Sequence, residues 1–158
     1  MTRYISLKDT NKLIRAALKE SFPGAKFSVV GDSYAGGAST RVSWTDGPAK
    51  HDVEAVVDKF AGASFDGMID LKSYHTSELK GEQVHFGADY VFADREVSPE
   101  EIARLRPEVE AELARQGEVS EFRYYEGVCI EGIDRVLFGG LDSIIRTVSE
   151  YRARKVSQ

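Results

Sequence analysis

The chain has 158 residues, of which 42% are hydrophobic and 30% are charged. This composition is typical of a folded domain and excludes a chain that is disordered throughout. The 26 acidic and 21 basic side chains leave a net charge of −5, which repels nucleic-acid phosphates and argues against a broad DNA-binding surface.

The cysteine count and the absence of long apolar runs exclude further classes. Cys129 is the single cysteine, so an intramolecular disulfide and a cysteine-based zinc site are excluded, and we expect a small core residue there. No stretch has the length of a signal peptide or a membrane span. We therefore expect a cytoplasmic protein without a membrane partner.

A helix is the first predicted element. Apolar residues between positions 9 and 22 recur at steps of three and four, which predicts an amphipathic helix. Ser6 or Asp9 can cap its start. Pro23-Gly24 should end it, because proline cannot continue the hydrogen-bond ladder and glycine tolerates a left-handed turn.

A β-hairpin should follow, because the apolar period changes to two from residue 26 onward. Thr40, Val42 and Trp44 share one face, and we expect Trp44 to pack under a helix. The connection from Gly31 to Gly37 is longer than a tight turn, and Gly36-Gly37 permits positive φ angles near its tip.

A second helix and a second pair of strands come next. Asp46-Gly47-Pro48 is typical of a helix start, and the helix should bury four apolar residues, Val53, Val56, Val57 and Phe60. Strict alternation over residues 84–92 predicts a strand, and residues 65–74 are its expected partner. The order α-β-β-α-β-β predicts an α+β fold, an antiparallel sheet with the helices packed on one face.

Residues 98–158 should form a mainly helical extension of the domain at residues 1–97. Ser98-Pro99-Glu100-Glu101 is a capping box, Pro107 should kink or split the helix, and Gly117 should end it. A second helical stripe covers residues 133–151, which Gly139-Gly140 can divide. Residues 122–130 can add an edge strand. The apolar faces can dock on the sheet or form a homodimer contact.

Several ordered sequence blocks resemble a known family. They are Tyr4-Ile5-Ser6, Lys12-Leu13-Ile14-Arg15, Phe22-Pro23-Gly24, Lys26-Phe27-Ser28-Val29, Tyr34-Ala35-Gly36-Gly37, Val42-Ser43-Trp44-Thr45-Asp46-Gly47-Pro48, Phe65-Asp66-Gly67-Met68, Asp70-Leu71-Lys72-Ser73-Tyr74-His75 and His85-Phe86-Gly87-Ala88-Asp89-Tyr90-Val91-Phe92. The set resembles the large polyvalent protein-associated domain class, type 29, over residues 1–97. The resemblance implies a protein of phages, plasmids or conjugative elements and carries over no catalytic residue.

Clustered polar groups in the second pair of strands are one candidate site. If residues 65–75 pair with residues 83–92, His75 and His85 lie close together beside Tyr74 and Asp89, where imidazoles can bind a metal or titrate near neutrality. No spacing matches a known ligand pattern, so surface histidines are favoured over a metal or catalytic site.

The Gly-rich segment is the second candidate. Tyr34, Gly36 and Gly37 lie in a stretch whose backbone can cradle a phosphate, but phosphate loops lead into a helix and carry a lysine, so a hairpin connection is favoured. Such a loop can still contact a partner. Arg41 can line a polar sheet face, although the basic residues are too few for a nucleic-acid surface.

The sequence favours a non-enzymatic accessory protein of a mobile genetic element that acts by protein-protein contact, with a host defence complex as the suggested target. The first alternative is a nucleic-acid-binding module that uses the sheet face or the Gly-rich hairpin. The second is a small enzyme with a site near Tyr74, His75 and His85. We expect no cofactor and no metal.

Overall fold

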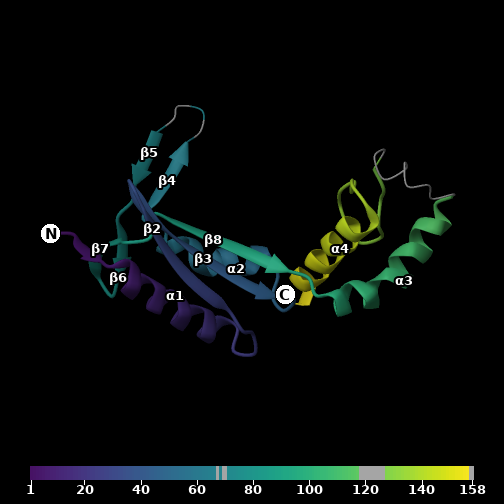
Figure 1. Ribbon diagram of the computed structural model, residues 1–158, viewed down its shortest axis with the longest axis horizontal. Coiled ribbons are helices and arrows are strands. Elements are labelled where there is room, and N and C mark those ends of the chain that lie inside the picture. Colours follow the sequence, from purple (N-terminus) through teal and green to yellow (C-terminus); the bar gives the residue numbers. More distant parts are fainter. Residues whose placement is uncertain (67, 69–70, 118–126, 157–158) are drawn as a thin grey trace. The chain divides into compact units, whose positions relative to one another are not determined.

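The computed structural model describes residues 1–66, 68, 71–117 and 127–156. The chain divides into two compact units (Figure 1). The first unit contains residues 1–44 and 50–95, and the second contains residues 45–49 and 96–158.

The first unit begins with strand β1 (Arg3–Ile5) and helix α1 (Leu7–Ser21). The Ser6 hydroxyl accepts a hydrogen bond from the Asp9 backbone N–H at 3.1 Å, which caps the helix. The apolar face of α1 is buried at Ile14 and Leu18. The predicted helix, its cap at Ser6 and its end before Pro23 are confirmed.

Strands β2 (Ser28–Tyr34) and β3 (Gly37–Thr45) form the predicted antiparallel hairpin. The expected long connection is wrong, because pairing continues from Val29↔Val42 to Tyr34↔Gly37 and leaves a two-residue turn. Gly36 makes the turn possible with a φ of 90°. Trp44 is buried as predicted.

Helix α2 (Lys50–Val57) and the short 3₁₀ helix η1 (Asp58–Phe60) follow. Asp46 and Gly47 have φ angles of 54° and 61°, so the chain turns through left-handed conformations and α2 begins after Pro48 rather than at it. Of the four predicted apolar positions, Val53, Val57 and Phe60 are buried, and Val56 is partly buried against the same core.

The remaining strands of this unit are β4 (Ala63–Asp66), β5 (Leu71–Tyr74), β6 (Ser77–Leu79), β7 (Glu82–Phe86) and β8 (Tyr90–Glu96). The predicted pairing of residues 65–74 with residues 83–92 is wrong, because β4 pairs with β5. Strand β7 pairs antiparallel with β6 and parallel with β1, and β8 joins β2 and β3 in the order β2-β3-β8.

The alternation over residues 84–92 therefore spans two strands rather than one. The chain bends between them at residues 87–89. A Cβ atom at Gly87 would lie 2.6 Å from the backbone nitrogen of Leu7, so only glycine fits the close approach at this bend. The bend also changes which positions face inward, since Phe92 is 47% exposed and Ala93 is buried.

The α+β class is confirmed, but the predicted order α-β-β-α-β-β is incomplete: among the described residues, β1 precedes the first helix, five strands follow α2, and the strands form three small sheets rather than one. One apolar core holds the first unit together. It contains side chains from α1, α2 and η1 and from two of the three sheets, Ile5, Ile14, Leu18, Val29, Val42, Trp44, Val53, Val57, Phe60, Val84, Phe86 and Ala93, with Leu79 packed against it. Strands β4 and β5 contribute none of these side chains beyond the buried Ala63 at their base.

The second unit contains helices α3 (Pro99–Arg115) and α4 (Leu141–Val156). Ser98 caps α3 by accepting a hydrogen bond from the Glu101 N–H at 3.1 Å, as predicted. Helix α3 continues through Pro107, so this residue does not split it, and it ends before Gly117. The predicted helix from residue 133 is wrong, because α4 begins only after Gly139-Gly140.

A separate apolar core holds the second unit together. The apolar side chains along one face of α4 are buried in it. Its buried members are Leu105, Val109, Leu113, Val128, Ile130, Leu137, Ile144, Ile145 and Val148. Cys129 is exposed, which corrects the expected core position: its neighbours Val128 and Ile130 face inward, and alternation turns the residue between them outward. The edge strand predicted over residues 122–130 lies largely outside the described residues. Within the described ranges, no helix is long and apolar enough to span a membrane.

Candidate functional site

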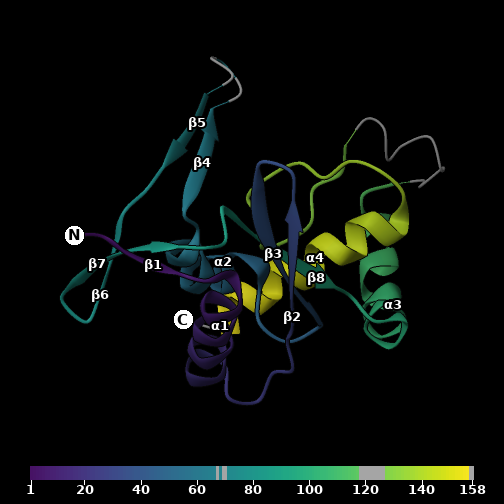
Figure 2. The ribbon, with the colours of Figure 1, turned by 60° about the vertical axis from the view of Figure 1, so that its left-hand side comes forward.

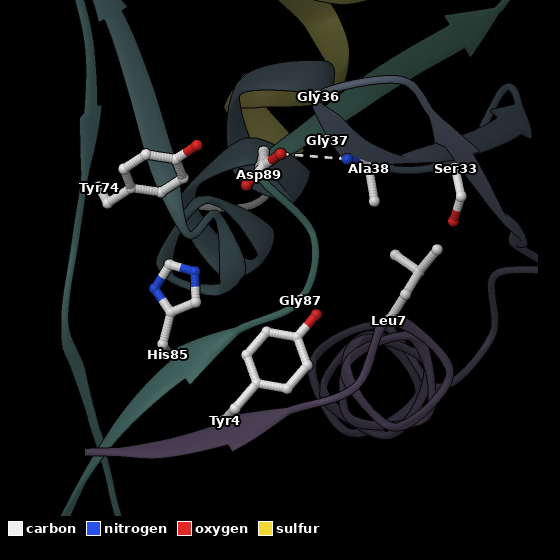
Figure 3. Close-up of a pocket in the computed structure, with 10 residues that line it drawn as sticks. All are labelled: Tyr4, Leu7, Ser33, Gly36, Gly37, Ala38, Tyr74, His85, Gly87 and Asp89. Carbon is white, nitrogen blue, oxygen red and sulfur yellow. Dashed lines mark hydrogen bonds between the residues drawn. The ribbon is translucent and has the colours of Figure 1, made fainter. Parts of the chain in front are cut away.

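A pocket of about 350 Å³ lies in the first unit, among β1, β7 and the β2–β3 hairpin (Figure 3). It is lined by Tyr4, Leu7, Ser33, Gly36, Gly37, Ala38, Tyr74, His85, Gly87 and Asp89. The volume lies at the lower end of the range for small-ligand sites, so it suits one compact chemical group.

Backbone hydrogen bonds fix the position of Asp89 at the bend between β7 and β8. Its N–H donates to the carbonyl of Ala38 at 2.8 Å, and its carbonyl accepts from the N–H of Ala63 at 3.0 Å. The residue is 7% exposed. A buried carboxylate needs partners, and Asp89 accepts hydrogen bonds from the Ala38 N–H at 3.0 Å and from Lys72 Nζ at 2.9 Å, both at Oδ2.

Lys72, on β5, connects three segments of the first unit. Besides Asp89, its ammonium donates to the carbonyl of Gly36 at 3.1 Å and lies 5.0 Å and 5.6 Å from the ring centres of Tyr74 and Tyr90. The hydrogen bond to Asp89 raises the pKa of Lys72 above its ordinary value. Lys72 therefore stays charged and holds β5 against the β2–β3 turn.

Gly37 is required by the close packing around this ion pair. A Cβ atom there would lie 2.2 Å from Oδ2 of Asp89 and 3.1 Å from Nζ of Lys72. The backbone of β3 can approach the carboxylate only because position 37 has no side chain.

His85 lies between two tyrosine rings. Its ring centre is 6.0 Å from that of Tyr4 and 5.8 Å from that of Tyr74. Its Nδ1 is 3.0 Å from the carbonyl oxygen of His75, and because a carbonyl only accepts, Nδ1 must carry a proton. In the neutral ring, Nε2 is then an acceptor, and Figure 3 shows it on the side that faces the pocket.

The pocket brings together five of the residues singled out in the sequence, Gly36, Gly37, Tyr74, His85 and Asp89. The other three lie outside it. The ring of His75 bonds to the hydroxyl of Ser64, Tyr34 ends β2 and is 46% exposed, and Arg41 forms an ion pair with Asp94. Whether any of these residues binds a ligand stays a prediction.

Two residues that the sequence reasoning missed are Tyr4 and Lys72. Tyr4 lies beside His85 because β1 pairs in parallel with β7, with the register Tyr4↔His85. A three-residue strand shows no readable alternation, so only the pairing itself reveals this contact. Lys72 is a lysine in a short strand, and no local pattern distinguishes it from a solvent-exposed one.

A second surface feature is the hairpin of β4 and β5, here called the β4–β5 arm, which extends away from the remainder of the first unit in both ribbon views (Figures 1 and 2). Four large apolar side chains on the arm are exposed: Phe65 (56%), Met68 (96%), Leu71 (53%) and Tyr74 (62%). Phe65 pairs with Lys72 and Leu71 with Asp66, so strand alternation places Phe65 and Leu71 on opposite faces.

Within residues 1–66, 68, 71–117 and 127–156, no group of three or more His, Cys, Asp or Glu side chains is placed to hold an ion. His85 and Asp89 both line the pocket, together with aromatic rings and backbone.

Comparison with known proteins adds a family. No curated protein and no solved structure matches the chain. Residues 5–98 match the family described as large polyvalent protein associated domain 29. The match covers more than half of the sequence and includes every residue that lines the pocket except Tyr4. The chain therefore belongs to the large polyvalent protein associated domain 29 family, whose members are associated with phages and other mobile elements.

Proposed function

We propose that this protein is a non-enzymatic accessory protein of a mobile genetic element that acts in the host cytoplasm by binding another protein through the β4–β5 arm. The observation that carries the proposal is the exposure of large apolar side chains on both faces of that two-stranded arm. An isolated two-stranded hairpin is marginally stable in water. A partner that encloses the arm would bury these side chains and stabilise it.

The chemistry of the arm favours a protein partner over nucleic acid. Its exposed large side chains are apolar or aromatic, and its described cation, Lys72, is already engaged by Asp89. Clustered exposed apolar groups are typical of protein interfaces. The nucleic-acid alternative required free cations on the sheet face, and there Arg41 is paired with Asp94. The net charge of −5 also disfavours nucleic acid, because it repels backbone phosphates.

The enzymatic alternative has weaker support in the geometry. His85 and Tyr74 do line the pocket, but His75 faces Ser64 instead. The Asp89 carboxylate is engaged by Lys72 and the Ala38 N–H. A general base needs its acceptor directed at a reacting proton, and Oδ2 of this carboxylate is already used by the ion pair with Lys72 and by the Ala38 N–H.

The experiment is capture of partners by the full chain in bacterial cells, followed by purification of the recovered protein and direct titration. Phe65→Ser and Leu71→Ser remove apolar groups from the two faces of the arm. Phe138→Ser is the matched control, since Phe138 is 61% exposed but belongs to the second unit. We expect each arm variant to weaken binding by about 30-fold, or about 2 kcal/mol.

The control variant should bind as the unchanged protein does. A purified partner whose affinity is the same for all variants would exclude the arm as the interface. Failure to recover any partner that binds the purified chain would contradict the proposed function. If the recovered partner is a component of a host defence system, the suggested anti-defence role gains its first direct support.

A further inference from the structure

We propose that the pocket beside the arm binds a guanidinium group, the side chain of an arginine on the protein partner. This inference rests on the proposed function for the identity of the partner, while the chemistry of recognition comes from the pocket. Three features of the pocket carry it: an available carboxylate oxygen, an inward-facing imidazole nitrogen and two exposed tyrosine rings.

The carboxylate of Asp89 uses only one of its oxygens inside the protein. Both of its hydrogen bonds, from Ala38 and from Lys72, fall on Oδ2. In the part of the chain that the structure describes, Oδ1 has no partner, and Figure 3 shows the second oxygen directed toward Tyr74 and His85. An ionised carboxylate has about four acceptor positions, so Oδ1 can receive donors while Lys72 stays in place.

The imidazole of His85 supplies a second acceptor. Its Nδ1 proton is used by the His75 carbonyl, so neutral Nε2 offers a lone pair to the same pocket. Two inward-facing acceptors favour a ligand that carries at least two hydrogen-bond donors. Guanidinium has five such donors in a planar fork, whereas an ammonium group is a compact point charge.

The rings of Tyr4 and Tyr74 supply stacking surfaces. They are 65% and 62% exposed and lie on either side of His85. Planar cations stack on aromatic faces. Because Lys72 lies 5.0 Å from the centre of the Tyr74 ring and occupies one of its faces, the ring of Tyr4 is the main stacking surface for a guanidinium. The pocket lining itself contains one carboxylate and no lysine or arginine.

Size and charge agree with this occupant. A volume of about 350 Å³ accommodates a guanidinium with part of its aliphatic stem. The net charge of −5 attracts cations and repels the phosphates of a nucleotide. A nucleobase also combines a flat ring with N–H donors, so nucleosides form the competing class in the test.

The test is a titration of the full chain with N-acetyl-arginine methylamide, followed by NMR of the tyrosine and histidine rings. The comparison probes are the matched lysine and citrulline derivatives, adenosine and cytidine. Citrulline keeps the planar shape and loses the charge. We expect the arginine probe to shift the ring signals of Tyr4, Tyr74 and His85 saturably, and the citrulline probe to bind at least tenfold more weakly.

Variants separate the pocket from the surrounding surface. Tyr4→Ala removes an exposed ring and should weaken the arginine probe at least fivefold. Tyr34→Ala is the matched control, because Tyr34 is 46% exposed on the adjacent hairpin and does not line the pocket. Asp89→Asn should weaken binding more than tenfold, and because it also alters a buried bond, circular dichroism must confirm its fold. Tyr4→Ala keeps the test decisive if Asp89→Asn does not fold.

Several outcomes would overturn the inference: no saturable shift with the arginine probe, equal binding of citrulline, or ring shifts produced by the nucleosides in its place. Its failure is distinguishable from that of the proposed function. If the partner binds Phe65→Ser more weakly but binds Tyr4→Ala as tightly as the unchanged protein, the arm is the interface and the pocket does not bind the partner. If the arginine probe binds but no partner protein is recovered, the pocket is a guanidinium site and the proposed protein-binding function is contradicted.

Discussion

Gly37→Ala is the sharpest test of the packing around Asp89. The new Cβ would lie 2.2 Å from Oδ2 of Asp89, a distance that forces the carboxylate to move. Asp89 is buried and receives the Ala38 N–H at 3.0 Å. A hydrogen bond to a charged group contributes about 1.5–3 kcal/mol and overpacking costs about 1–3 kcal/mol, so we expect Gly37→Ala to lower the free energy of unfolding by about 2–4 kcal/mol.

Urea unfolding followed by tryptophan fluorescence measures this change. Trp44 is the single tryptophan and lies in the core of the first unit, so its signal reports on the unit that contains the substitution. Gly24→Ala is the matched control, because a Cβ at Gly24 meets nothing within 4 Å and its φ is not in the left-handed region. We expect that control to change stability by less than about 0.5 kcal/mol.

A double-mutant cycle with Asp89→Ala isolates the cause. If the clash with the carboxylate is responsible, Gly37→Ala should add less than about 0.5 kcal/mol once Asp89 is truncated. A Gly37→Ala variant as stable as the unchanged protein would refute the geometry. A cost that persists in full after Asp89→Ala would place the strain elsewhere.

Three further predictions test other parts of the structure. Thr10→Val should cost about 1–3 kcal/mol in urea unfolding, because fully buried Thr10 accepts the Gly87 N–H at 3.2 Å and valine leaves that donor unpaired; an unchanged midpoint would contradict this. The raised pKa of Lys72 means that its ion pair stabilises the fold below pH 10.5 and is lost as the pH rises through the folded-state pKa. The difference in Tm between the unchanged protein and Lys72→Met should therefore narrow above pH 10.5, and a constant gap would show that the ion pair is not its source. Leu105→Ala should destabilise the second unit by about 2–5 kcal/mol in helical circular dichroism while the Trp44 transition stays in place, because each unit has its own core; a shift of the Trp44 transition would show that the two units do not unfold separately.

The predicted homodimer through the C-terminal helices stays a prediction. Ile144, Ile145 and Val148 of α4 are buried within the second unit of one chain, so their apolar stripe does not require a second copy. Sedimentation velocity over a range of concentrations measures the oligomeric state directly. A single monomeric species throughout would exclude the dimer.

Local signals in the sequence were sufficient to predict the boundaries of α1 and α3, but not the starts of α2 and α4. Ser6 and Ser98 cap helices because a serine hydroxyl just before a helical apolar pattern can accept a hydrogen bond from a free N–H of the first turn. Gly117 follows the end of α3 because glycine tolerates the left-handed conformation that often ends a helix. The break at Gly87 was missed because alternation continues through it in the sequence. Only the close approach of Leu7 and Ile5 shows why the strand must bend there.

Strand pairing and the composition of the pocket could not be predicted in the same way. The neighbours of β7 depend on contacts between distant segments, which short strands do not encode locally. His85 and Asp89 were identified from their side-chain chemistry, and the pocket adds Tyr4 and leaves out His75. The expected histidine pair failed as a unit because β5 pairs with β4 instead of β7, although the His75 carbonyl still orients His85.

The parallel pairing of β1 with β7 has a consequence for how this protein folds. Thr10 and Gly87, which are hydrogen-bonded beside that pairing, are 77 residues apart in the sequence. Closing so long a loop is entropically unfavourable, so contacts of this kind form late and slow the folding of a domain. During synthesis on the ribosome, α1 and the β2–β3 hairpin can form early. The backbone N–H and C=O groups of β1 stay unpaired until residues 82–86 of β7 have been synthesised. An unpaired strand edge of this kind can pair with another chain before its own partner is available.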